Sequence, residues 1–130
     1  MGGSVPALTI EPVDGPFGAS VTGVDLRRLD APTAARLRSA WLRHQVLVFP
    51  DQDLGFADLE AVARAFGPIG ADPYFRPIPG QPHVVALTRE SDESAPLFAD
   101  VWHSDWSFLP SPPAATLLYG VEIPPVGGDT

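Results

Sequence analysis

A histidine and an aspartate two positions apart, His103 and Asp105 in the stretch VWHSDWSF, are the residues of this sequence best suited to chemistry. In a β-strand, residues i and i+2 project from the same face, so the imidazole and the carboxylate would point together. They could then occupy adjacent sites on one metal ion, as two of the three ligands of a two-histidine, one-carboxylate Fe(II) centre. The spacing alone leaves a second interpretation open: an aromatic core segment in which these two polar side chains share a surface hydrogen bond.

The other candidates for chemistry are weaker. His44 falls at the end of a predicted helix, where a cation is favoured, and His83 follows a proline at the start of a predicted strand, so we expect structural roles for both. A metal-independent hydrolase that uses His103 and Asp105 as an acid–base pair lacks a nucleophile, since Ser104 would face away from both in a strand.

Helices are predicted over residues 30–45 and 55–67. Asp30 or Thr33 can cap the first, Pro32 suits its first turn, and Gly67 with the proline after it ends the second. Helical spacing relates Ala34, Leu37, Trp41 and His44 in the first helix, and places Phe56, Leu59, Ala63 and Phe66 on one face of the second.

Short strands are predicted on both sides of these helices. The first lies within residues 7–13, where apolar and polar residues alternate, and a glycine-rich turn leads into another short strand before residue 26. Residues 46–50 form a continuous apolar run that predicts a buried strand. Further strands are expected at residues 83–88, 101–106 and 114–123. Helices come early and strands late, without regular βαβ alternation, so the predicted fold class is α+β or mostly β.

Composition limits the classes of protein. The 130 residues suffice for one domain, and 45% of them are hydrophobic. The formal net charge of −8 disfavours nucleic-acid and anionic-membrane partners. The absence of cysteine excludes disulfides and thiolate metal sites. Neither a secretory signal nor a membrane-spanning apolar run is evident, so we expect a cytoplasmic protein.

Several ordered stretches together resemble the TauD/TfdA family, the taurine dioxygenase-like enzymes that use Fe(II) and 2-oxoglutarate. The resemblance covers essentially the whole chain and is more specific than any one motif. It implies that the two predicted helices precede part of a double-stranded β-helix, or jelly roll, whose barrel is incomplete in this chain. The stretches that carry the resemblance are GASVTGVDL, WLRHQVLVFPDQ, ARAFGPIG, VWHSDWSF and PPAATLLYGVEIPPVGGDT.

The resemblance implies roles for three residues. His103 and Asp105 match the first histidine and the carboxylate of the iron-binding triad, and Thr130 matches the threonine that helps hold the distal carboxylate of 2-oxoglutarate. The implied reaction consumes O₂ and 2-oxoglutarate, hydroxylates a small organic substrate, and releases succinate and CO₂. The expected cofactors are therefore Fe(II), 2-oxoglutarate as co-substrate, and O₂.

The resemblance also bears on the substrate. Taurine-specific members contact the sulfonate with a histidine and an asparagine, and the matching positions here are Asp72 and Ala99. An aspartate repels a sulfonate and an alanine donates no hydrogen bond, so taurine is not the expected substrate. Phe75 and Trp106 are candidates for a more apolar pocket wall, with core packing as the alternative.

The family's second histidine ligand and its 2-oxoglutarate-binding arginine have no match in residues 1–130. Arg76 and Arg89 do not match that arginine. We therefore interpret residues 1–130 as the N-terminal portion of one dioxygenase domain that is inactive by itself. The alternative is a non-catalytic binding or structural module derived from a truncated dioxygenase. The sequence leaves a homo-oligomer open.

Overall fold

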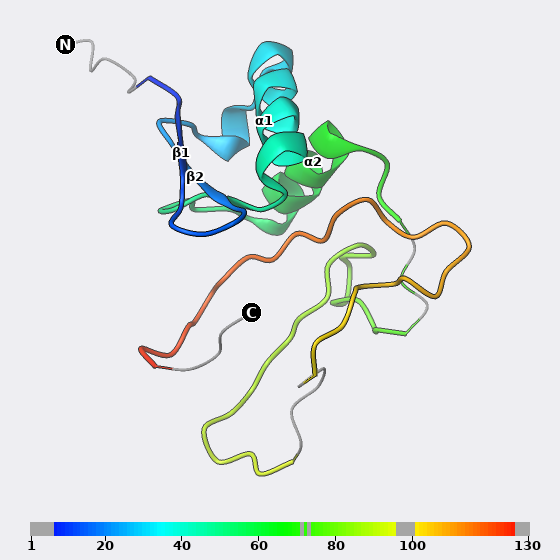
Figure 1. The fold of residues 1–130 in the computed structure, drawn as a ribbon. Helices are drawn as coiled ribbons and strands as arrows, with labels where there is room; N and C mark the ends of the chain where they lie inside the picture. Colours follow the sequence, from blue (N-terminus) through cyan, green and yellow to red (C-terminus); the bar gives the residue numbers. More distant parts are fainter. Residues whose placement is uncertain (1–6, 71, 73, 96–100, 127–130) are drawn as a thin grey trace, which may run out of the picture.

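The computed structural model describes residues 7–70, 72, 74–95 and 101–126. All its regular elements fall in the first half of the chain (Figure 1). In chain order they are β1 (Thr9–Pro12), β2 (Ala19–Thr22), the short 3₁₀ helix η1 (Leu26–Arg28), α1 (Ala31–His44), β3 (Leu47–Val48) and α2 (Phe56–Phe66). We call residues 9–66 the N-terminal body, and the described residues from 68 onward the distal chain.

The body contains a three-stranded sheet in the order β1-β2-β3. β1 and β2 pair antiparallel, with Thr9 opposite Thr22, whereas β2 and β3 pair parallel, with Ala19 opposite Leu47. Since α1 connects the two parallel strands, the body holds one βαβ crossover that the sequence interpretation did not foresee. Gly18, directly before β2, has a φ of +99°, a backbone conformation that favours glycine.

α1 begins and ends where the sequence predicts. The Asp30 carboxylate accepts a hydrogen bond from the Thr33 amide at 2.8 Å, and Pro32 lies in the first turn. The hydrogen bonds from Thr33 hold the pKa of Asp30 below its usual value. The helix ends at His44, and the capping residue Gln45 has a φ of +68°, which turns the chain toward β3.

α2 packs beside α1. The Arg38 guanidinium of α1 donates to the Phe66 carbonyl at 2.7 Å, and the rings of Trp41 and Phe66 meet edge to face with centroids 6.1 Å apart. Val62 is the buried residue of α2. Phe56, predicted to share one helix face with Leu59, Ala63 and Phe66, is the first residue of α2 and is 48% exposed.

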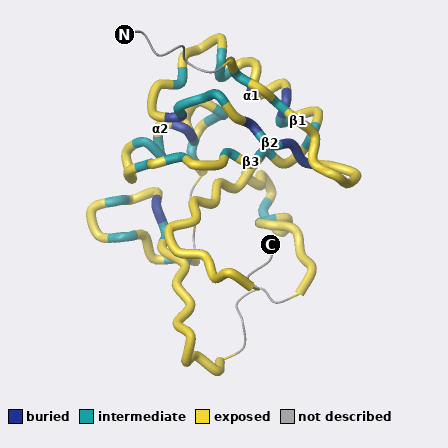
Figure 2. Tube along the Cα trace, turned by 90° about the vertical axis from the view of Figure 1, so that its left-hand side faces the viewer, coloured by how far each residue is buried: buried dark blue, intermediate teal, exposed yellow. Residues whose placement is uncertain are grey.

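The core lies between the sheet and the two helices. Its buried residues are Val21, Leu26, Leu37 and Val62, from β2, η1, α1 and α2. Figure 2 shows that nearly all buried positions belong to the body, whereas the distal chain is mostly exposed. The exception in the distal chain is Val84, which is buried; its carbonyl accepts from the Ile78 amide and its amide donates to the Gln81 carbonyl.

The later strands were predicted wrongly. Within the described residues no strand follows β3, and the segments 83–88, 101–106 and 114–123 are irregular. A strand exists only where a neighbouring strand accepts and donates its backbone hydrogen bonds, and no described segment pairs with these three. The predicted buried strand at 46–50 is reduced to two residues, and Val48 is half-exposed because β3 is an edge strand.

The fold class is therefore α+β, with a three-stranded sheet and two helices. The prediction of two N-terminal helices is confirmed, and a mostly β composition is wrong for the described residues. The described part of the chain does not form a barrel. Among the helices it contains, none is long and apolar enough to cross a membrane.

Candidate metal site

His103 and Asp105 converge without being in a strand. Residues 102–104 are irregular, and a turn over residues 105–108 follows, closed by the Leu109 amide donating to the Trp106 carbonyl at 2.9 Å. Trp106 takes a φ of +53°, which is uncommon for a bulky residue. The expectation of an extended segment is thus wrong. The expectation that the two side chains point together is met by a different backbone, with His103 Nε2 3.1 Å from Asp105 Oδ1.

The hydrogen bonds of His103 determine where its protons lie. Nδ1 is 2.8 Å from the Val101 carbonyl oxygen, which only accepts, so Nδ1 carries a hydrogen. Nε2 faces Asp105 Oδ1, and an ionised carboxylate also only accepts. Two acceptors face each other unless a cation lies between them. The arrangement therefore favours either a protonated imidazole or a metal ion.

The same contacts raise the pKa of His103. The hydrogen bond to the Val101 carbonyl is the main cause, the charge and hydrogen bond of Asp105 act in the same direction, and partial desolvation opposes them. The two side chains are 47% and 51% exposed, so solvent screens their attraction. A cation at this position would still be reachable from solution.

The donor atoms suit a divalent cation. Two ligands about 2.1 Å from one metal at a right angle to each other are about 3.0 Å apart, close to the 3.1 Å between Nε2 and Oδ1. One imidazole nitrogen and one carboxylate oxygen are also the donor types of non-haem Fe(II) sites. Among the residues that the structure describes, no group of three His, Cys, Asp or Glu side chains could hold a metal ion, so this pair lacks a third protein ligand there.

Thr116 and Tyr119 connect the pair to the body. The Thr116 hydroxyl donates to Asp105 Oδ2 at 2.9 Å. Three residues further, the Tyr119 hydroxyl donates to the Gln52 carbonyl at 3.1 Å and accepts from the Leu54 amide at 3.2 Å. Figure 1 shows this segment, in orange, running beneath the body. Contacts between segments more than sixty residues apart thus hold Tyr119, three residues after the Thr116 that donates to Asp105.

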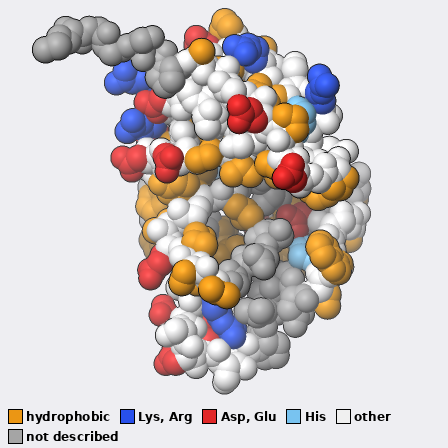
Figure 3. Space-filling view, turned by 60° about the vertical axis from the view of Figure 1, so that its left-hand side comes forward, with side chains coloured by type: hydrophobic (Ala, Val, Ile, Leu, Met, Phe, Trp, Pro, Cys, Tyr) orange, Lys and Arg blue, Asp and Glu red, His pale blue; other side chains and the backbone are white. Residues whose placement is uncertain are grey.

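Four aromatic rings gather beside the pair. Tyr74 stacks on Trp106 with centroids 5.6 Å apart, and Phe108 meets both rings edge to face. Phe75 also meets Trp106 edge to face, at 6.5 Å. The two predicted pocket residues, Phe75 and Trp106, are therefore brought together. Figure 3 shows hydrophobic side chains around a hollow in the middle of one face of the molecule.

The remaining predicted site residues have different outcomes. Asp72 Oδ1 accepts hydrogen bonds from the amides of Tyr74 and Phe75 at 2.8 and 3.0 Å, so its carboxylate shapes the turn that presents these rings. Ala99 and Thr130 lie outside the described residues.

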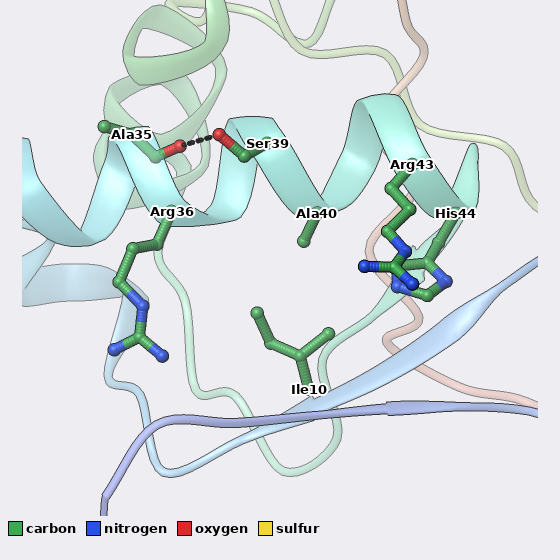
Figure 4. Close-up of a pocket in the computed structure, with 7 residues that line it drawn as sticks. All are labelled: Ile10, Ala35, Arg36, Ser39, Ala40, Arg43 and His44. Atoms are coloured by element: carbon green, nitrogen blue, oxygen red, sulfur yellow. Dashed lines mark hydrogen bonds between the residues drawn. The ribbon is translucent and has the colours of Figure 1, made fainter.

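A hollow of about 510 Å³ lies elsewhere, between β1 and α1 (Figure 4). Its lining includes Ile10, Arg43 and His44, and Ser39 donates to the Ala35 carbonyl along its edge. None of the residues predicted for the metal or substrate site lines it. It is a shallow surface feature of the body rather than part of the candidate site.

Sequence reasoning missed Thr116, Tyr119 and Tyr74. Thr116 and Tyr119 fall in a stretch whose apolar residues predict a strand, and nothing in that pattern marks a contact with Asp105. Tyr74 adjoins Phe75 in a proline-rich loop, and two consecutive aromatic residues in a loop are a signal that could have been used.

The chain belongs to the taurine catabolism dioxygenase TauD, TfdA family, whose model matches residues 9–130. A similar protein is the (S)-phenoxypropionate/alpha-ketoglutarate-dioxygenase of Sphingobium herbicidovorans, 34% identical over 131 residues that cover 96% of this chain and 44% of the relative. Another is the alpha-ketoglutarate-dependent sulfate ester dioxygenase of Pseudomonas putida, 34% identical over 125 residues that cover 95% of this chain and 40% of the relative.

A solved structure is also similar. The crystal structure of a taurine dioxygenase from Burkholderia xenovorans matches with a TM-score of 0.55 and 36% identity, over 65% of this chain and 32% of that one. The chain thus spans less than half the length of these curated relatives. The fold match and the family match agree.

Proposed function

We propose that this chain provides two ligands of the metal centre of an Fe(II)- and 2-oxoglutarate-dependent dioxygenase, which hydroxylates a small organic substrate and releases succinate and CO₂. The observation that carries the proposal is the approach of His103 Nε2 to within 3.1 Å of Asp105 Oδ1, a pair of donor atoms that a metal ion can bridge when Nε2 carries no proton. Family membership supports it, because the relatives named above are alpha-ketoglutarate-dependent dioxygenases.

Each residue has a defined part in this proposal. His103 binds the metal through Nε2 while its Nδ1–H is held by the Val101 carbonyl, an outer contact that fixes the ring. Asp105 binds through Oδ1, the oxygen that faces His103 Nε2. Thr130 holds the distal carboxylate of 2-oxoglutarate, a prediction from the family pattern. When bound, Fe(II) with 2-oxoglutarate supplies the O₂ chemistry.

Domain organisation and location follow as further parts of the proposal. Residues 1–130 form the N-terminal portion of one dioxygenase domain in the cytoplasm. Support for the first part is that the chain matches 40–44% of its relatives' length while almost all of it is matched. In a complete domain, partner strands would pair with the irregular segments at 101–106 and 114–123 and complete the jelly roll.

Metal binding by this chain can be tested directly with Mn²⁺. The sequence has three histidines, so the imidazole signals in an NMR spectrum are few. We expect the His103 signals to broaden at the lowest Mn²⁺ concentration, and His103→Ala or Asp105→Asn to remove the binding. His83→Ala is the matched control and should leave it intact. Equal broadening of all three histidines would reject the site.

Turnover needs more than these two ligands. A 2-oxoglutarate dianion requires a compensating cation, usually an arginine, and two ligands bind a metal less tightly than three. We expect the 130-residue protein to form no succinate from 2-oxoglutarate with iron and O₂. Succinate formation by this protein would overturn the assignment of residues 1–130 as an incomplete site.

For the substrate, we infer an organic acid with an apolar or aryl group rather than taurine. The stack of Tyr74 on Trp106, with Phe75 and Phe108 beside it, supports an apolar wall. The negative charge of Asp72 disfavours a sulfonate there. The (S)-phenoxypropionate relative from Sphingobium herbicidovorans acts on a substrate of the inferred kind.

The substrate inference is tested on a protein that includes the rest of the family domain. We expect weak or absent sulfite release with taurine, and faster succinate formation with aryloxy acids. Rapid taurine-dependent sulfite release would reject the inference and leave the metal proposal standing.

A second candidate function is a non-catalytic binding or structural module derived from a dioxygenase. The observation that favours it is that the described residues offer no third ligand. The gene sequence beyond codon 130 distinguishes the two functions. A reading frame that continues to a histidine and an arginine at family-like spacing supports the enzyme, whereas a stop codon directly after Thr130 supports the module.

A further inference from the structure

The Asp105 carboxylate has two distinct oxygens in this structure. Oδ1 faces His103 Nε2 at 3.1 Å, and Oδ2 accepts the Thr116 hydroxyl at 2.9 Å. Each oxygen therefore has a separate neighbour. An aspartate with no such neighbours can rotate about χ1, which moves the whole carboxylate, and about χ2, which exchanges its oxygens, particularly when half of its side chain is exposed. The position of Oδ1 therefore depends on what holds Oδ2.

A hydroxyl on a mobile segment would give little restraint, because water competes for an exposed hydrogen bond. Thr116, however, lies only three residues before Tyr119, which is hydrogen-bonded to the body. Tyr119, one short step along the chain, is fixed to the turn after β3 by two hydrogen bonds, to the Gln52 carbonyl and from the Leu54 amide.

That turn is itself fixed to the preceding part of the body. The Gln52 side chain accepts from the Leu26 amide at 3.0 Å and donates to the Val24 carbonyl at 3.1 Å. Hydrogen bonds thus connect Gln52 to the rest of the body and Tyr119 to the Gln52 carbonyl, and the backbone joins Tyr119 to Thr116, three residues before it. The Thr116 hydroxyl in turn donates to Asp105 Oδ2.

We propose that Thr116 is a positioning residue, whose hydroxyl holds Asp105 Oδ2 so that Oδ1 stays directed at the point between the carboxylate and His103 Nε2. The inference rests on the proposed function, because the cation between these two atoms is what gives the orientation its use. Thr116 does not itself bind the cation. Its effect is to restrict Asp105 to one rotamer before the cation binds, so that binding costs less side-chain entropy.

The test uses the 130-residue protein and three substitutions. Thr116→Val removes the hydroxyl and keeps the shape of the side chain, whereas Thr116→Ser keeps the hydroxyl. Ser107→Ala is the control: it removes a hydroxyl from the turn that contains Asp105, one that donates to the Ser104 carbonyl and not to Asp105. Three-bond NMR couplings across χ1 of Asp105 report its rotamers without any metal. The backbone amide spectrum of the body shows whether each variant is folded.

We expect one dominant Asp105 rotamer in the parent protein, in Thr116→Ser and in Ser107→Ala, and averaged couplings in Thr116→Val. The Mn²⁺ concentration that half-broadens the His103 signals should rise about 10-fold or more in Thr116→Val and be restored in Thr116→Ser.

The outcomes separate the two proposals. Unchanged Asp105 couplings in Thr116→Val, or averaging in Thr116→Ser as well, would overturn the role of the Thr116 hydroxyl. Averaged couplings only in Thr116→Val, with no Mn²⁺ effect on His103 in any protein, would support the positioning role and reject the metal site.

Discussion

The N-terminal body and the distal chain differ in where their backbone hydrogen bonds go. In the body, β2 pairs on both sides and the helices cover the sheet, so a buried core forms. In the distal chain, long apolar stretches have no described strand to pair with, and side chains such as Trp102, Val121 and Val126 are exposed. Yet the two proposed metal ligands, His103 and Asp105, are in the distal chain. The body thus supports the candidate site, which is attached to it through side-chain contacts such as those of the Tyr119 hydroxyl.

Truncating a side chain at the centre of the core should reduce stability more than any other substitution considered below. Leu37 is fully buried, at 0% exposure, between α1 and the sheet. Leu37→Ala should reduce the free energy of unfolding by about 2–5 kcal/mol, because lost burial and a cavity both contribute. Urea unfolding followed by circular dichroism measures it.

The matched control for this prediction is Leu42→Ala in the same helix, where the side chain is 67% exposed. It should change stability by no more than about 0.5 kcal/mol. Equal losses for the two variants would contradict the assignment of the core to the body.

A smaller loss is expected at the turn between β1 and β2. Gly18 has a φ of +99°, and a Cβ added to it would lie 2.9 Å from Val13 Cγ2. Gly18→Ala should cost more than about 1 kcal/mol, since both the backbone and the contact are strained. Thermal unfolding would show the loss.

Gly67 offers a control for that substitution, because it is extended and a Cβ there meets nothing within 4 Å. Gly67→Ala should leave the melting temperature nearly unchanged. If the two alanine variants melted together, strain at Gly18 would not be the cause.

The hydrogen bonds of Tyr119, which link the distal chain to the body, should contribute less to stability than Leu37 or Gly18 does. Tyr119→Phe removes the hydroxyl that accepts from the Leu54 amide and donates to the Gln52 carbonyl. One net hydrogen bond is worth about 0.5–1.5 kcal/mol, so the Leu54 amide should exchange its hydrogen roughly threefold to tenfold faster. Tyr74→Phe, at the other of the two tyrosines, should not alter this amide. No change in Tyr119→Phe would mean that the distal chain is held to the body by other contacts.

The difference between the regions also explains what the sequence could predict. β1, α1 and α2 are encoded locally, by alternation, by the Asp30 cap and by helical spacing, and each prediction is confirmed within a residue or two. The parallel pairing of β2 with β3 was missed because it depends on contacts across α1 rather than on either short sequence.

In the site, the convergence of His103 and Asp105 followed from their spacing, although the backbone that achieves it is a turn and not a strand. Spacing fixes which side chains are near each other, and several backbones satisfy it. The contact of Thr116 with Asp105 spans eleven residues, and Tyr119 reaches across more than sixty. No pattern within a single segment encodes contacts of that range.

The smallest effect concerns the protonation of His103. Its pKa is raised chiefly by the hydrogen bond to the Val101 carbonyl, and secondarily by Asp105. A raised pKa means that the structured state binds the proton more tightly than the unfolded chain. The contribution to stability is therefore fully present below the unfolded pKa and is lost as pH rises through the folded one. Since a metal needs the unprotonated Nε2, Mn²⁺ affinity should increase over that same rise in pH.

The substitution Asp105→Asn should lower the pKa of His103 only part of the way to its ordinary value, because the hydrogen bond to the Val101 carbonyl remains. An NMR titration of the imidazole signals tests this, and a pKa that stays the same or rises in Asp105→Asn would contradict the contact between the two side chains.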